Sequence, residues 1–290
     1  MLIPELSTVK TQGQSVKIKH DRRSVLSILR QNKYFLGGDF YGAVKTCATC
    51  FGGRVYLTRD HHTAPVHWAR GIVEGKLGYR SLLLHVDAHP DLKFSIVPVD
   101  RRVMGANGIP VTLDALMRET KRVVKMSDSY PDLTPEECFV QSAIELGIIG
   151  EYVHIIPGDD GSFSLSSLAV PSSVHTLESF LHRPLLNGAC TVILGIDLDF
   201  FSALPGMPYN RPANLGPDLD KLISILRLFN PGIITITFSP FSTGLVHRYL
   251  TINEEQCADV IVRVLEALNL LESELKFVDE PRRDMRFSPK

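Results

Sequence analysis

The chain has 290 residues, of which 44% are hydrophobic, and a formal net charge of −1. This composition is sufficient for one large core, or for a core with an inserted subdomain. The balanced charge argues against a protein that binds the phosphate backbone of nucleic acids, and no apolar run approaches the roughly 20 residues of a membrane helix.

The N-terminal region and the cysteines indicate a cytoplasmic protein. Residues 1–14 are mixed and mostly polar, without the apolar centre of a signal peptide. The five cysteines are scattered along the chain, an odd number that is typical of reduced thiols. Cys47 and Cys50 form a CxxC, but no second pair completes a tetrahedral zinc site, so we interpret them as two incidental thiols in a loop.

Short apolar runs predict the strands of a buried sheet. The runs are rich in Leu, Ile and Val and do not alternate with polar residues, which is typical of parallel strands that are covered on both faces. They comprise residues 55–57, 82–86, 152–156, 191–196 and 233–238.

Segments with helical periodicity lie between these runs. Apolar residues recur at helical spacing over 219–229, after Pro217, and again over 258–268. Strands that alternate with helices predict the α/β class, a three-layer α/β/α domain with a central, mostly parallel sheet, over residues 1–290. Two segments interrupt the pattern and would shape a substrate entrance: 97–140, with one or two helices, and 157–171, a surface loop.

Acids and a histidine spaced by two residues follow two of the apolar runs. Asp87, His89 and Asp91 come after the run 82–86, and Asp197 and Asp199 come after the run 191–196. An extended backbone points side chains at this spacing to the same side, so each motif presents its ligands together.

Carboxylates at the ends of buried strands are costly without nearby cations. Lys93 would neutralise one of them at most, whereas two divalent ions nearly balance four. Turn formation or helix capping is the ordinary role of Asp after a strand, but it accounts for one acid rather than for two spaced motifs. Oxygen and imidazole ligands together predict a metal site.

A histidine pair follows the run 55–57 and offers one further ligand. Either His61 or His62 would supply it, although such residues are often surface or capping residues. His67 and His85 are interpreted as structural, since His85 lies inside a predicted strand.

The three motifs resemble, in the same order, those of the arginase–deacetylase (ureohydrolase) superfamily. The sequences are Asp60-His61, Asp87-Ala88-His89-Pro90-Asp91 and Asp197-Leu198-Asp199, and the resemblance spans about residues 55–240. In detail they are most similar to a branch that includes the peptide arginases, which convert arginine to ornithine inside ribosomally made precursor peptides. The resemblance implies an arginase-like fold and two Mn²⁺ ions, other divalent metals being possible.

The resemblance also implies a role for each ligand. Asp87 and Asp197 would bridge both ions, and His62 is the alternative to His61 if the first motif is shifted by one residue. Asp91 would also aim the attacking water. The remaining ligands divide into His61 and Asp91 at one ion and His89 and Asp199 at the other.

The departures from the family pattern concern the substrate. Lys93 stands where free-amino-acid arginases have an Asn that holds the substrate carboxylate, and Asn107 stands where a histidine proton shuttle is expected. Thr237, in Thr237-Phe238-Ser239-Pro240, replaces the guanidinium-binding glutamate. We expect Lys93, Asn107, Thr237 and Ser239 to line the substrate site. The proton for the leaving amine would come from Asp91, His62 or solvent, and Asp279 or Glu280 could replace the glutamate.

These features together predict a peptide arginase that acts on arginine in a precursor peptide and releases urea, with no nucleic-acid or membrane partner. Two alternatives stay open. Thr237 keeps an amidohydrolase of the deacetylase type possible, and a non-catalytic, peptide-binding member would have the same fold. The sequence does not define the oligomeric state.

Overall fold

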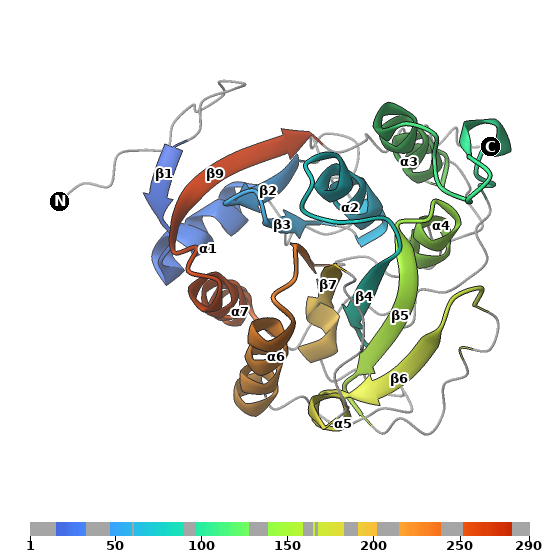
Figure 1. The fold of residues 1–290 in the computed structure, drawn as a ribbon. Helices are drawn as coiled ribbons and strands as arrows, with labels where there is room; N and C mark the ends of the chain where they lie inside the picture. The colour runs from blue at the N-terminus through green and yellow to red at the C-terminus, as the bar shows by residue number, and fades with distance from the viewer. Residues whose placement is uncertain are drawn as a thin grey trace, which may run out of the picture.

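A computed structural model of the chain provides the structure. It describes residues 16–32, 47–59, 61–89, 97–127, 139–158, 165, 168–182, 191–201, 215–238 and 252–279. Within these residues, one nine-stranded sheet runs through the centre of the molecule (Figure 1).

The sheet consists of a parallel block and an antiparallel flank. From β3 to β6 in sheet order, neighbouring strands are parallel, whereas β1, β9, β2 and β3 pair antiparallel. The strands, in sheet order, are β1 (Val16–Lys19), β9 (Glu272–Asp279), β2 (Cys47–Phe51), β3 (Val55–Thr58), β8 (Ile233–Thr237), β7 (Val192–Asp197), β4 (Ser81–Val86), β5 (Ile149–Ile156) and β6 (Ser172–Thr176).

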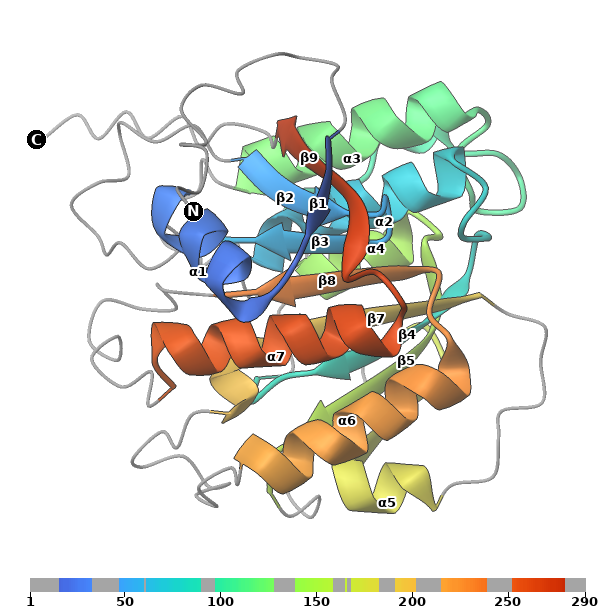
Figure 2. The same ribbon diagram turned by 90° about the vertical axis from the view of Figure 1, so that its left-hand side faces the viewer.

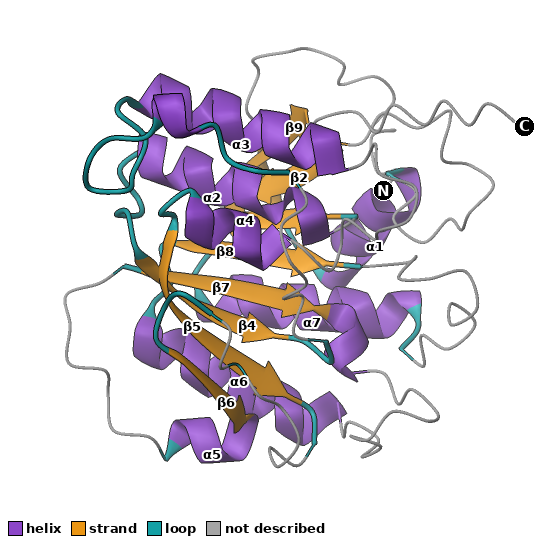
Figure 3. Cartoon of the chain, turned by 90° about the vertical axis from the view of Figure 1, so that its right-hand side faces the viewer, coloured by secondary structure: helices purple, strands orange, loops and turns teal. Residues whose placement is uncertain are grey.

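Helices cover both faces of the sheet, which confirms the predicted three-layer α/β/α class. One face carries α1 (Arg22–Gln31), α5 (Leu177–Leu181), α6 (Leu215–Phe229) and α7 (Glu254–Ala267) (Figure 2). The other face carries α2 (Ala64–Val73), α3 (Leu113–Ser127) and α4 (Phe139–Glu145) (Figure 3). The short 3₁₀ turns are η2 (His61–Thr63), η3 (Arg101–Val103) and η5 (Leu198–Phe201).

The central strands explain why apolar runs without alternation predict this sheet. Every residue of β4 is buried, and its side chains alternate between two hydrophobic clusters. Leu82, Leu84 and Val86 pack beneath α6 and α7, while Leu83 packs on the opposite side, beneath α2 and α4. A strand that is covered on both faces needs apolar residues at every position.

The two predicted helical stripes lie in α6 and α7. Helix α6 begins at Leu215, two residues earlier than Pro217 suggested, so the proline lies within the first turn, where no intrahelical N–H bond is lost. Helix α7 begins after Asn253, whose side chain accepts a hydrogen bond from the Gln256 amide, while the Gln256 side chain bonds back to Asn253.

The interpretation of the CxxC as part of a loop is wrong. Cys47 and Cys50 lie in β2, between β3 and β9. Cys50 is buried, and burial raises the pKa of its thiol, which keeps the sulfur protonated and unreactive. The misinterpretation arises because β2 (CATCF) lacks the Leu, Ile and Val run of the central strands.

The structure describes parts of the two interrupting segments. Segment 97–140 contains η3, α3 and the beginning of α4. The described residues of 157–171 contain no helix or strand, and β6 begins directly after them. Among all described segments, each helix is too short or too polar to pass through a lipid bilayer.

Candidate metal centre

The three metal motifs lie at one edge of the sheet because each follows a parallel strand. His61 comes after β3, Asp87 comes directly after β4, and Asp197 is the last residue of β7. Strands β3, β8, β7 and β4 are neighbours, and their carboxyl ends meet at the same edge. Val86 pairs with Ile196, so the next residues, Asp87 and Asp197, emerge side by side.

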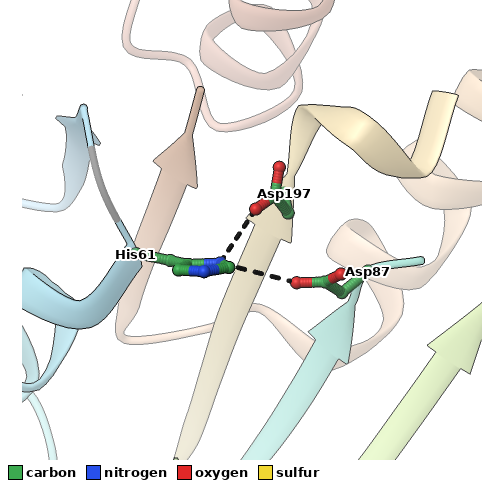
Figure 4. A group of neighbouring side chains, drawn as sticks. All are labelled: His61, Asp87 and Asp197. Carbon is green, nitrogen blue, oxygen red and sulfur yellow. Dashed lines mark ion pairs between the residues drawn. The ribbon is translucent and has the colours of Figure 1, made fainter. Parts of the chain in front are cut away.

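The first group of potential ligands contains His61, Asp87 and Asp197 (Figure 4). His61 Nδ1 lies 2.8 Å from Asp197 Oδ2 and 3.7 Å from Asp87 Oδ2. All three residues are buried, and their ligand atoms lie within 4.8 Å of one another. This spacing is suitable for one ion bound between an imidazole and two carboxylates.

The second group contains Asp87, His89 and Asp199, and it shares Asp87 with the first. His89 Nδ1 lies 2.9 Å from Asp199 Oδ2 and 3.6 Å from Asp87 Oδ1. The two oxygens of Asp87 therefore face different groups, since Oδ2 is near His61 and Oδ1 is near His89. This geometry is what a carboxylate that bridges two ions would need.

Backbone amides hold the acids of both motifs in place. The His89 amide donates to Asp87 Oδ1 at 2.6 Å, and the Asp199 amide donates to Asp197 Oδ1 at 3.0 Å. The first acid of each pair is thus fixed by the amide two residues later, which is the usual geometry of an Asx turn. The same contact turns the chain sharply after the strand and directs the second side chain into the site.

The acids have perturbed pKa values because they are buried close together. Burial and the charges of Asp197 and Asp87 raise the pKa of Asp199 to about 7, although His89 opposes the rise. Burial also acts to raise the pKa of Asp87, but His85, His61 and His89 outweigh it and hold this pKa well below its usual range. The buried acids therefore carry negative charge, which the neighbouring imidazoles partly offset.

His89 supplies compensating positive charge next to Asp199 and Asp87. Burial acts to lower its pKa, but hydrogen bonds with Asp199 and Asp87 outweigh burial and raise the pKa to about 12. A dication at this position would replace the proton, because a histidine ligates metal in its neutral form. Three buried carboxylates with two imidazoles form a donor set that is suitable for Mn²⁺ or a similar hard to borderline dication.

Two residues of β5 support Asp87, His154 by direct contact and Tyr152 through His85 of β4. His85 Nε2 lies 3.1 Å from Asp87 Oδ2, and His85 Nδ1 lies 3.0 Å from the Tyr152 hydroxyl. His154 Nε2 lies 3.1 Å from the Asp87 carbonyl oxygen. Burial lowers the pKa of His154 to about 3, so its ring is neutral and donates its single proton to that carbonyl. His85 was interpreted from sequence as structural, and Tyr152 and His154 were not connected with the site.

The structure contradicts one predicted substrate residue. Asn107 is exposed, and its carbonyl oxygen accepts a hydrogen bond from the Arg80 guanidinium at 2.8 Å. Arg80 directly precedes β4, so Asn107 lies at the amino edge of the sheet, opposite the metal motifs. The expectation that Asn107 lines the substrate site is wrong. It relied on the short match of Gly108-Ile109-Pro110-Val111 to the family's Gly-x-Pro-Val pattern, and such a match carries no information about which end of the sheet it follows.

Two further predicted residues lie near the motifs without being in either ligand group. Thr237 ends β8 beside Asp197, and its Oγ1 lies 3.0 Å from Thr58 Oγ1, so this position is neutral and buried. His62 follows His61 in η2 and lines a small, mostly apolar cavity against α3 and α4. Several other predicted positions lie outside the described residues: Asp60, Asp91, Lys93, Ser239 and Glu280.

Fold and site together define an α/β protein with two overlapping groups of potential metal ligands at the carboxyl edge of a mostly parallel sheet. No family model and no curated protein matches the sequence.

Among solved structures, the chain is similar to a hypothetical agmatinase from Burkholderia thailandensis, with 15% identity, 86% of this chain and 62% of that chain covered, and a TM-score of 0.40. It is also similar to formimidoylglutamase from Bacillus subtilis (14% identity, 74% and 60% covered, TM-score 0.40). A third similar structure is Helicobacter pylori arginase (13% identity, 85% and 76% covered, TM-score 0.41). The chain thus spans less than two thirds of the first two proteins.

Proposed function

We propose that this protein is a binuclear-metal hydrolase of the arginase–deacetylase superfamily. The observation that supports it most strongly is that one carboxylate, Asp87, belongs to both ligand groups and turns a different oxygen toward each. When bound, two divalent ions supply an activated water and polarise the substrate at near-neutral pH. His61 would hold one ion and His89 the other.

The roles of the remaining ligands follow from the motif resemblance, which implies that Asp197 would serve both ions together with Asp87. In the structure Asp197 belongs to the His61 group, and Asp199 would complete the His89 site. Asp91 would complete the His61 site, accept a hydrogen bond from the attacking water and orient it toward the substrate carbon. Acids that are fixed by backbone amides keep this arrangement before substrate arrives, which reduces the reorganisation needed for catalysis.

For the substrate, we propose arginine side chains of a ribosomally made precursor peptide, converted to ornithine with release of urea. The proposal follows the motif resemblance. A substrate whose backbone lies within a peptide needs no clamp for a free carboxylate, and the loss of that clamp at Lys93 is consistent with this. The guanidinium partner and the proton donor for the leaving amine would come from residues other than Asn107 and Thr237.

One observation favours a second candidate, an amidohydrolase of the deacetylase type. The neutral Thr58–Thr237 pair is buried at the end of β8, where the family places an acid for the guanidinium. An uncharged amide would not require that acid.

The test is product analysis with the metal-loaded protein. Peptides with arginine or with acetyl-lysine would be incubated in manganese buffer, with metal content measured in parallel. A loss of about 42 Da per arginine, with ornithine and urea formed, is the expected result, by the stoichiometry of this class of hydrolysis. Loss of acetate would instead support the amidohydrolase.

The Asp87→Asn variant distinguishes the activity of the proposed metal centre from background activity. It should lose bound metal and turnover, because it removes a ligand of both ions. Asp114→Asn makes the same exchange at an exposed helix position and should behave as wild type. Bound metal without turnover of either peptide would indicate a binding protein, and a wild-type protein that takes up no metal would overturn the proposal altogether.

A further inference from the structure

His85 and Tyr152 lie on the protein side of the proposed metal centre, and the role inferred for them rests on the proposed function. Both oxygens of Asp87 are held from the protein side. Oδ1 accepts a hydrogen bond from the His89 amide at 2.6 Å, while Oδ2 lies 3.1 Å from His85 Nε2. A carboxylate that serves two ions must keep its plane, because rotation would move one oxygen away from its ion. Oδ1 is thus held by a hydrogen bond, whereas Oδ2 is held by a close ion-pair contact with the His85 imidazole.

The ring of His85 is itself fixed in one tautomer. A carboxylate oxygen only accepts hydrogen bonds, so the tautomer that suits this position carries its proton on Nε2, facing Asp87. Nδ1 then carries a lone pair and accepts the hydroxyl proton of Tyr152 at 3.0 Å. The opposite tautomer would place two acceptors 3.1 Å apart, which is unfavourable.

Strand pairing explains why Tyr152 lies next to His85. In the parallel register of β4 and β5, Leu83 pairs with Tyr152 and His85 pairs with His154. Alternation along the strands turns all of these side chains to the same face, beneath α4. The Tyr152 side chain extends along the strand direction to reach His85, and both side chains are buried.

Phe139 of α4 packs on both imidazoles at this position. Its ring stacks on His61 at 5.0 Å and meets His85 edge-on at 5.7 Å. The ring therefore restricts His85 laterally, while the contacts of its two ring nitrogens with Tyr152 and Asp87 fix its rotation.

We infer that Tyr152 and His85 are positioning residues that hold the Oδ2 half of Asp87 for the ion bound by His61. The series of contacts from Tyr152 through His85 to Asp87 supports one ion site selectively, because the Oδ1 half is held independently by the His89 amide. Residues that orient metal ligands typically change metal affinity by about 10- to 100-fold when they are replaced.

The experiment is Mn²⁺ titration of metal-free protein with metal-buffered solutions, combined with electron paramagnetic resonance. Wild type should bind two ions and give the signal of a spin-coupled pair. His85→Leu should weaken one of the two binding steps by about 10- to 100-fold and give a mononuclear signal at intermediate Mn²⁺. His85→Gln, whose amide can still donate to Asp87, should recover part of the affinity.

Tyr152→Phe removes only the hydroxyl and should weaken the same step by a smaller factor. In the His85→Leu background it should have no further effect, because Tyr152 acts through His85. Tyr56→Phe is the matched control, since Tyr56 is a buried tyrosine in β3 of the same sheet, where it stacks on His67. It should bind two ions as wild type does.

The outcomes separate the two proposals. If wild type takes up no Mn²⁺, the proposed function fails. If wild type binds two ions and His85→Leu and Tyr152→Phe do so with unchanged affinity, the positioning role is wrong while the metal centre stands. Equal weakening of both ions by Tyr152→Phe and Tyr56→Phe would also overturn it, because that result would reflect general loosening of the fold.

Discussion

Buried histidines have different roles in this molecule, depending on what surrounds each ring nitrogen. His20, between β1 and α1, is fully buried and contacts the Ser273 carbonyl through Nε2 at 3.0 Å. Its ring meets Phe51 edge-on at 4.8 Å. The neutral form with its proton on Nε2 is suitable for this position, whereas a second proton on Nδ1 would be buried against apolar neighbours.

This environment predicts that stability falls at mildly acidic pH. Burial lowers the pKa of His20 below 6.5, and the hydrogen bond to Ser273 opposes this only in part. The unfolded chain therefore takes up the proton first, so the contribution of His20 is present above about pH 6.5 and is lost as the pH falls below it. One proton changes the free energy of unfolding by at most about 1.4 kcal/mol per pH unit.

Urea denaturation at pH 7.5 and 5.5 would test this prediction. His20→Gln keeps a donor for Ser273 but cannot be protonated, and it should flatten the pH dependence. His182→Gln replaces an exposed histidine and should keep the wild-type slope. An identical slope in all three proteins would contradict the prediction.

At the residue scale, the sequence was informative about which strand ends carry potential ligands. His61, Asp87 and Asp197 belong to three motifs and lie together, because each motif comes at the end of a parallel strand. Asp199, in contrast, lies in the 3₁₀ turn η5 and not on the extended backbone that the spacing argument assumed. The link from Tyr152 to His85 depends on the register between β4 and β5, which no local pattern encodes. Asn107 was misplaced for a related reason, since a motif match does not say which edge of the sheet it follows.

At the scale of elements, the position of α2 matters because His61 lies in the turn just before it. Gly71 allows this helix to pack closely on β8. A Cβ atom at Gly71 would lie 2.6 Å from Ile233 Cγ1 and 2.9 Å from Leu77 Cδ1. Both contacts are shorter than van der Waals distance, so the helix would have to move or its neighbours would have to change rotamer.

Gly71→Ala should therefore destabilise the protein by about 1–3 kcal/mol, as overpacking of a core commonly does. Gly216→Ala is the control, because Gly216 is also helical and has no heavy atom within 4 Å of its missing Cβ. That substitution should be neutral or stabilise by up to about 1 kcal/mol. Chemical denaturation measures both changes, and equal stability of the two variants would disprove the close packing of α2.

The elements that could be predicted from sequence were those buried on both faces. Strands β3, β4, β5, β7 and β8 match the apolar runs, because a strand between two helical layers needs apolar residues throughout. Strands β1, β2, β6 and β9 are missing from the prediction. They are short or have polar residues interspersed, as in VKIK and SSVHT, and β1 and β9 pair with strands that are distant in sequence.

For the molecule as a whole, an ion bound at the candidate metal centre would connect loops after three strands and should therefore affect global stability. A ligand that binds only the folded state stabilises it by about 2.7 kcal/mol at a concentration 100 times its Kd. Mn²⁺ should raise the Tm of chelator-treated protein, and a chelator should reverse the shift. The reason is that an ion offsets the mutual repulsion of Asp87, Asp197 and Asp199.

Asp199→Asn should lose most of this Mn²⁺-dependent shift, because it removes a ligand of the His89 site. Its metal-free form should be at least as stable as wild type, since one repelling acid has become neutral. Asp114→Asn should respond to Mn²⁺ as wild type does. Calorimetry with and without Mn²⁺ measures these shifts, and a folded wild type that does not respond would contradict the prediction.

The placement of β9 between β1 and β2 has a consequence for how the chain is made. His20 and Ser273 touch although they are 253 positions apart, so β1, the first described strand, has to wait for β9, the last described one. The parallel centre can assemble earlier, leaving β1 and β2 as open edges on a half-finished nascent chain. Such edges are where chaperones and unwanted strand pairing compete during translation.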